Sequence, residues 1–160
     1  MTSLTVPSPA ACPTGRPLGS GAEPQTRDRL SRYDCALPHH VSAAAVARHA
    51  AKPVLVSWGL DGDTVYDALL VISELVTNAV EHALPSIALH LEAATAPGGH
   101  TSVCIDVTDG GPAPVPGPWI ASCAADEHGR GQQVVTALAQ RAGIHHSPHA
   151  TDHWAALEAA

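Results

Sequence analysis

The sequence predicts an α+β domain, a two-layer sandwich in which a mixed, mostly antiparallel sheet carries its helices on one face. Residues 86–94 and 101–109 alternate apolar and polar side chains around a Pro-Gly-Gly turn, which predicts a hairpin. Residues 64–84 repeat apolar side chains every three or four positions, which is typical of a helix with one buried stripe. Elements that are apolar on one side only are buried best by a second layer.

The elements before the hairpin follow from local signals. Residues 32–38 alternate and end at a proline, which predicts a first strand. A helix is expected from Val41 to Gly59, bent or split at Pro53. Asp61 or Asp63 is expected to cap the next helix, because either side chain can accept hydrogen bonds from free N–H groups. The core-facing stripe of that helix is Leu69, Ile72, Val76, Ala79 and Ala83.

After the hairpin, residues 110–131 hold four prolines and five glycines, so we expect a long surface loop there. Residues 132–143 predict a short helix closed by Gly143, and residues 144–159 predict two last strands around a turn at Pro148. Residues 1–30 are rich in Pro, Gly, Ser and Ala without a period. We therefore expect a disordered tail over 1–30 and one folded domain over 31–160.

Charge and composition exclude several classes of function. The chain has a formal net charge of −7 and only eight Lys and Arg residues, which argues against nucleic-acid binding and against docking on anionic lipid. It has no apolar run of membrane-spanning length and no signal-peptide pattern, so we expect a cytoplasmic protein. The four cysteines form no C-x-x-C pair and no spacing typical of a disulfide framework, so we expect reduced thiols.

The predicted helix over 64–84 carries an unusual polar line. Glu74, Asn78 and His82 follow one another at intervals of four residues, which places them along one stripe of a helix. An acid and an amide four residues apart also occur often on exposed helices, so this line alone does not distinguish a site from a solvated surface.

Three separated motifs resemble those of the GHKL ATPases, the group that includes gyrase and the histidine kinases. They are "ELVTNAVEH" on the polar helix, "DVTDGG" at the end of a strand, and "HGRG" before a short helix. The chain is most similar to the stand-alone anti-sigma-factor serine kinases and the related ATP-binding regulators of actinomycetes, with "SWGLDG" and "HWAALEA" as further matches. The resemblance covers about residues 32–158 and implies a Bergerat, or histidine-kinase-like ATPase, fold.

The resemblance implies roles for the polar stripe. Asn78 would bind a Mg²⁺ ion that bridges the phosphates of ATP, because a hard cation prefers oxygen ligands. Glu74 would act as the general base that accepts a proton from an attacking hydroxyl or water. For His82 a phosphate contact and a packing role remain equally open.

The other two motifs would hold the two ends of the nucleotide. A carboxylate at Asp109 can accept a hydrogen bond from the exocyclic amine of adenine, and Gly111 lets the backbone pass close to the base. Gly129, Arg130 and Gly131 precede a helix, whose free N–H groups attract phosphate. The loop over about 112–128 would be a lid over ATP.

Several residues depart from the family pattern. Gln132 stands where the family commonly has leucine, and the lid contains no lysine. The threonine that often supports the adenine-binding aspartate is replaced by Asp152 or shifted to Thr151, and an added carboxylate there would weaken ATP binding. The histidines between Ile144 and Trp154 suggest a metal site, but no partner falls at a recognised spacing, so we interpret them as solvated.

Three functions remain in competition. The first is a regulatory serine/threonine kinase that binds a sigma factor or phosphorylates a serine of a small antagonist protein, an anti-anti-sigma-like partner. The second is a non-catalytic module whose partner-binding surface is shaped by nucleotide. The third is a detached histidine-kinase catalytic domain, for which His39 and His40 are acceptor candidates without a dimerising helical hairpin before them. The sequence leaves a homodimer open as an assembly state.

Overall fold

The computed structural model describes residues 29–96, 98–114 and 130–159. Its elements are β1 (Arg29–Leu37), α1 (Ala43–Ser57), α2 (Gly62–His82), β2 (Ile87–Thr95), β3 (Thr101–Asp109), α3 (Arg130–Leu138), β4 (Arg141–His146) and β5 (Thr151–Glu158). The tail expected over residues 1–30 lies almost entirely outside the described residues. β1 begins at Arg29, two residues before the expected start of the domain.

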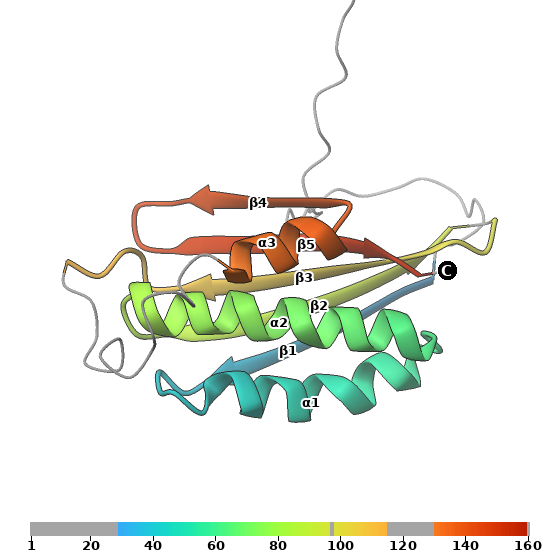
Figure 1. Ribbon diagram of the computed structural model, residues 1–160, viewed down its shortest axis with the longest axis horizontal. Helices are drawn as coiled ribbons and strands as arrows, with labels where there is room; N and C mark the ends of the chain where they lie inside the picture. The colour runs from blue at the N-terminus through green and yellow to red at the C-terminus, as the bar shows by residue number, and fades with distance from the viewer. Residues whose placement is uncertain (1–28, 97, 115–129, 160) are drawn as a thin grey trace, which may run out of the picture.

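The sheet has the strand order β1-β2-β3-β5-β4, and the helices lie on one of its faces (Figure 1). This arrangement confirms the two-layer α+β fold. Every neighbouring pair is antiparallel, so the expected mostly antiparallel sheet contains no parallel pair in the described residues. The hairpin of β2 and β3 pairs Ala88 with Thr108 at one end and Thr95 with Thr101 at the other.

The core lies between the sheet and the helices and is built without phenylalanine. Four members of the predicted α2 stripe are buried, and Leu69 packs against the core from a half-buried position. The largest side chains that are almost fully buried are Leu55, Ile72, Leu89, Leu91, Ile105, Val71, Val76, Val103 and Val107. At about 25 cal/mol per Å² of apolar surface, such burial is the main force that holds α2 against the strands.

The helix ends follow the local signals, with one exception. Asp61 caps α2, because its side chain accepts hydrogen bonds from the N–H groups of Asp63 and Thr64. α1 runs through Pro53 without splitting and is followed by Gly59 in a left-handed conformation. The prediction that Gly143 closes the third helix is wrong, since α3 ends at Leu138 and Gly143 lies inside β4.

Contact with Trp154, rather than helix capping, explains the glycine at position 143. A β-carbon there would lie 2.9 Å from the Trp154 ring, across the pair of β4 and β5. The same ring has the Arg141 guanidinium 5.9 Å from its centroid. A glycine inside a strand often marks a place where a neighbouring group approaches closely. The local sequence around Gly143 indicated the end of a helix instead.

Two other expectations concern cysteines and membranes. Cys35 is a free thiol, as expected. Cys12 and Cys123 lie outside the described residues. None of the helices in the described ranges combines the length and apolar character needed to cross a bilayer.

Candidate functional site

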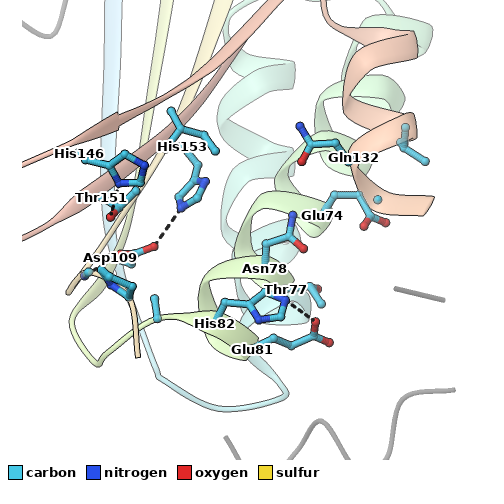
Figure 2. A pocket seen from close by; sticks show the side chains of 16 residues that line it. Glu74, Thr77, Asn78, Glu81, His82, Asp109, Gln132, His146, Thr151 and His153 are labelled. Carbon is cyan, nitrogen blue, oxygen red and sulfur yellow. Dashed lines mark hydrogen bonds and ion pairs between the residues drawn. The ribbon is translucent and has the colours of Figure 1, made fainter. Parts of the chain in front are cut away.

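A cavity of about 640 Å³ is bordered by α2, the end of β3, the start of α3, and the strands β4 and β5 (Figure 2). Six of the site residues predicted from the sequence line it, namely Glu74, Asn78, His82, Asp109, Gly111 and Gly131. The three separated motifs are therefore brought together in one place. Gly129 lies outside the described residues, and for Arg130 the structure describes only the backbone position at the start of α3.

α2 supplies one wall of the cavity through its polar face. Glu74 and Asn78 are half-buried one turn apart, and Thr77 and Glu81 stand beside them on the same wall. His82 sits in the last turn with its Nε2 atom 3.6 Å from Glu81 Oε2. Thr77 and Glu81 were not among the predicted site residues, although they lie three residues after Glu74 and Asn78, a spacing that places them on this face.

Glu74 faces the start of α3. A β-carbon at position 131 would overlap the Glu74 Oε2 atom, so only glycine fits there without a shift of the carboxyl group. Burial raises the pKa of Glu74 above its ordinary value, and the nearby Glu81 carboxylate raises it further. A carboxyl group with a raised pKa is better suited to hold a proton during catalysis than a fully solvated one.

Asp109 is the most enclosed polar group of the cavity, with 2% of its surface exposed. Its Oδ1 atom accepts a hydrogen bond of 2.8 Å from the Gly111 N–H, and its Oδ2 atom lies 3.2 Å from His153 Nε2. Gly111 has a φ of +89°, a conformation that favours glycine. The neighbouring Gly110 is also constrained, because a β-carbon there would overlap the Pro85 carbonyl oxygen. The close approach of Gly111 to an adenine base stays a prediction.

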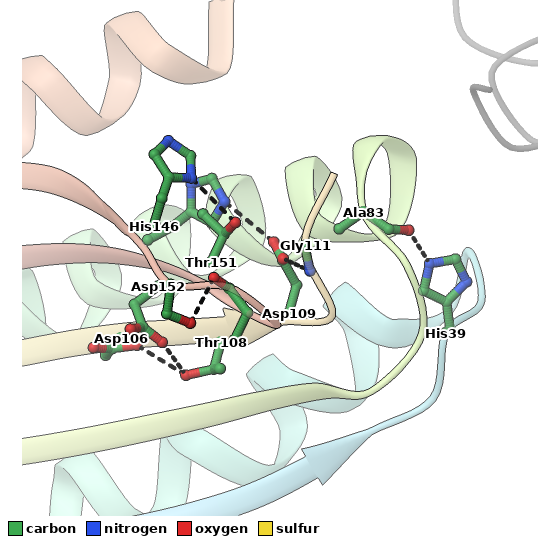
Figure 3. A network of polar contacts seen from close by, with 12 residues as sticks. His39, Ala83, Asp106, Thr108, Asp109, Gly111, His146, Thr151 and Asp152 are labelled. Carbon is green, nitrogen blue, oxygen red and sulfur yellow. Dashed lines mark hydrogen bonds and ion pairs between the residues drawn. The ribbon is translucent and has the colours of Figure 1, made fainter. Parts of the chain in front are cut away.

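Backbone hydrogen bonds fix the segment after Asp109 against the end of α2. The Leu84 N–H donates to the Gly111 carbonyl at 2.8 Å, and the Ala113 N–H donates to the His82 carbonyl at 2.9 Å. On the other side, His39 Nε2 lies 2.9 Å from the Ala83 carbonyl oxygen (Figure 3). These contacts hold Asp109 and α2 in a fixed relation.

The strands β4 and β5 form the wall beside Asp109. Thr151 is paired with Asp109 in the sheet and is buried, and His153 lies two residues further along the same face. Ile144 and His146 of β4 complete this wall. His146 is exposed, as expected of a solvated histidine, whereas the alternation of β5 turns His153 inward against that expectation.

Asp152 does not enter the cavity. It lies on the opposite face of the sheet, where its Oδ1 atom accepts a hydrogen bond of 2.8 Å from the Thr108 hydroxyl (Figure 3). The expectation that its carboxylate would weaken ATP binding is therefore not supported by its position. Thr151, and not Asp152, lies beside Asp109 on the cavity side of the sheet.

One donor of the cavity fits a magnesium ion. The Asn78 amide oxygen lines the cavity and is a hard oxygen ligand of the kind that Mg²⁺ prefers. Within the described residues, no group of three or more His, Cys, Asp and Glu side chains is arranged to hold a metal ion. A bound ion would therefore need oxygens from a ligand as well as from α2.

The comparisons with known proteins agree with this geometry. Residues 36–155, more than half of the chain, match the family described as histidine kinase-like ATPase domain, so the chain belongs to that family. Among curated proteins, none matches the chain in sequence.

A crystal structure of the RsbU and RsbW domains of Rv1364c from Mycobacterium tuberculosis has the same fold as part of its chain. It superposes with a TM-score of 0.57 at 24% identity, over 79% of the present chain and 32% of that chain. The present chain thus spans about a third of the length of that crystallised chain, and the likeness concerns the fold.

Proposed function

We propose that this chain is a regulatory ATP-binding protein that transfers the γ-phosphate of ATP to a serine of a small antagonist protein, and that it also binds a sigma factor. One observation carries the proposal: Glu74 and Asn78 on α2 face the same cavity as Asp109 and the start of α3. An acid, a magnesium ligand, an adenine acceptor and a phosphate-binding helix start are the parts that phosphoryl transfer requires. A cytoplasmic location, where ATP is abundant, belongs to the same proposal.

Each side chain has a defined task in this reaction. Asp109 binds the adenine amine, and Asn78 holds Mg²⁺, which neutralises the phosphate charge when it is bound. The serine oxygen attacks the γ-phosphorus while its proton passes to the Glu74 carboxylate. The bond between the γ-phosphorus and the bridging oxygen breaks, and ADP leaves with the electron pair of that bond.

The test compares Glu74→Gln with Glu81→Gln, the same substitution two turns along the same wall. With ATP and Mg²⁺, phosphate transfer to proteins encoded by neighbouring genes should fall by about 10²–10⁴ in Glu74→Gln and remain largely intact in Glu81→Gln. Both variants should bind ATP and the partner, because neither removes a proposed nucleotide ligand. If Glu81→Gln abolishes transfer and Glu74→Gln does not, the assignment of the base is wrong.

A second function is favoured by the charge of the cavity. Its described lining includes the carboxyl groups of Glu74, Glu81 and Asp109 and no lysine or arginine, so the phosphates of ATP meet little positive charge there. In this reading the chain is a non-catalytic module whose nucleotide state sets its affinity for a protein. A wild-type chain that binds a protein encoded by a neighbouring gene tightly but phosphorylates none would establish this second function.

A detached histidine-kinase domain ranks last among the candidate functions. Whether this chain forms a homodimer would be decided by measuring its mass in solution.

A further inference from the structure

The carboxylate assigned to adenine already has both of its oxygen atoms engaged within the protein. Oδ1 of Asp109 accepts from the Gly111 N–H at 2.8 Å, and Oδ2 lies 3.2 Å from Nε2 of His153. Only 2% of Asp109 is exposed, whereas 21% of the His153 side chain is. Figure 2 shows the His153 imidazole directed at the Asp109 carboxylate.

The strand register explains why the imidazole is there. His153 pairs with Val107 of β3 and with Ile144 of β4, so it points to the same face as Thr151 and Asp109. Position 153 is therefore directed into the cavity by the alternation of β5, and a side chain shorter than histidine would not reach Asp109 Oδ2. The contact with Asp109 therefore depends on the histidine at position 153 and is not a consequence of the fold alone.

The chemistry of the contact is the chemistry that adenine would use. The exocyclic amine of adenine presents an N–H donor to a carboxylate oxygen, and Nε2–H of His153 presents the same kind of donor to the same atom. Because only 2% of Asp109 is exposed, its carboxylate cannot receive the adenine amine unless a neighbouring side chain moves. The partly exposed side chain that contacts this carboxylate is His153.

We propose that His153 is an internal competitor for the adenine site: its imidazole occupies the Asp109 carboxylate and must turn away before adenine binds. This inference rests on the proposed function, because it concerns the same nucleotide. His153 therefore makes the affinity for adenine nucleotides lower than it would be in the same chain without this imidazole. Removing the imidazole strengthens ATP binding, which is the reverse of what removal of a binding residue does.

The experiment measures the affinities of the full chain for ATP and for inosine triphosphate with Mg²⁺ at one fixed pH. Inosine triphosphate replaces the amine by a carbonyl and gains nothing from a freed Asp109. His153→Ala should bind ATP at least about fivefold more tightly and inosine triphosphate with unchanged affinity, because a hydrogen bond to a charged group contributes about tenfold or more. His146→Ala, the matched control, should show no such gain.

Every outcome decides between the possibilities. If wild type binds ATP and His153→Ala binds it equally or more weakly, the inference is overturned while the proposed function stands, and weaker binding would show that His153 positions Asp109. If wild type fails to bind ATP and His153→Ala binds it, the inference is supported. If neither binds ATP, the proposed function and the inference both fail. Should the alanine variant unfold at a lower temperature, His153→Val, which suits a strand, serves in its place.

Discussion

Replacing Asp106 with asparagine should stabilise the folded chain at neutral and alkaline pH. Asp106 lies in β3 on the face of the sheet opposite the helices, flanked by His90 and Trp154, and it is 5% exposed. Burial and, after it, the nearby Asp152 carboxylate raise the pKa of Asp106 to about 6, although His90 and the Thr108 hydroxyl act in the opposite direction. The folded chain therefore binds a proton at this position more tightly than the unfolded chain does.

The sign and size of the effect follow from linkage. A carboxyl group with a raised pKa destabilises the folded state as the pH rises from about 4 through about 6, and the loss is complete above that interval. A shift from 3.8 to about 6 is roughly two units, which corresponds to an upper bound on the order of 3 kcal/mol. Asparagine has the same shape but cannot ionise, so the variant should gain up to that amount at pH 8 and almost nothing near pH 4.

Urea unfolding of both chains at several pH values between 4 and 8 measures the difference directly. Asp34→Asn is the matched control, because Asp34 is exposed and its carboxylate lies 2.6 Å from His90 Nδ1 on the same face. An exposed pair contributes little, so this control should change stability by less than about 1 kcal/mol and in the unfavourable direction. The reasoning is refuted if Asp106→Asn is no more stable than the wild type at pH 8, or if its advantage does not shrink on acidification.

The remaining predictions concern the cavity. Asp109→Asn should reduce the preference for ATP over GTP at least about tenfold, because it removes the charged acceptor; calorimetry that finds an unchanged preference would contradict the adenine assignment. Asn78→Ala should remove the Mg²⁺ dependence of ATP binding without lowering the unfolding temperature, whereas a large drop in that temperature would make Asn78 structural. Gly131→Ala should displace the Glu74 carboxyl group and reduce phosphate transfer while ATP still binds, and an unaffected transfer rate would show that the contact with Glu74 has no catalytic role.

Much of the fold was predictable because its signals are local. Alternation placed β2 and β3 within a residue or two, and the stripe from Leu69 to Ala83 placed α2 and its buried face. The end of α3 was not predictable in this way. Gly143 is a glycine because the Trp154 ring lies against it, and that contact depends on a strand pairing that the local sequence does not reveal.

The same distinction applies to the cavity. The spacing of Glu74, Asn78 and His82 was predictable because one helix fixes it, and the resemblance to the GHKL motifs singled out Asp109; the structure places all four at the cavity. His153 and Asp152 were misjudged because their positions depend on which face of β5 each one occupies. A shift of one residue in register exchanges the two faces, so sequence alone could not decide which of them faces the cavity.

The uneven distribution of the cavity residues along the chain predicts how random substitutions will act. All described residues that line the cavity lie at or after Glu74, and β1 and α1 contribute none of them. α1 instead buries Ala43, Ala47, Ala51 and Leu55 against the rest of the fold. A library of random substitutions scored once for abundance and once for nucleotide binding should therefore give two different maps. Variants in α1 should lose both properties together, while variants along the cavity wall should lose binding and remain abundant.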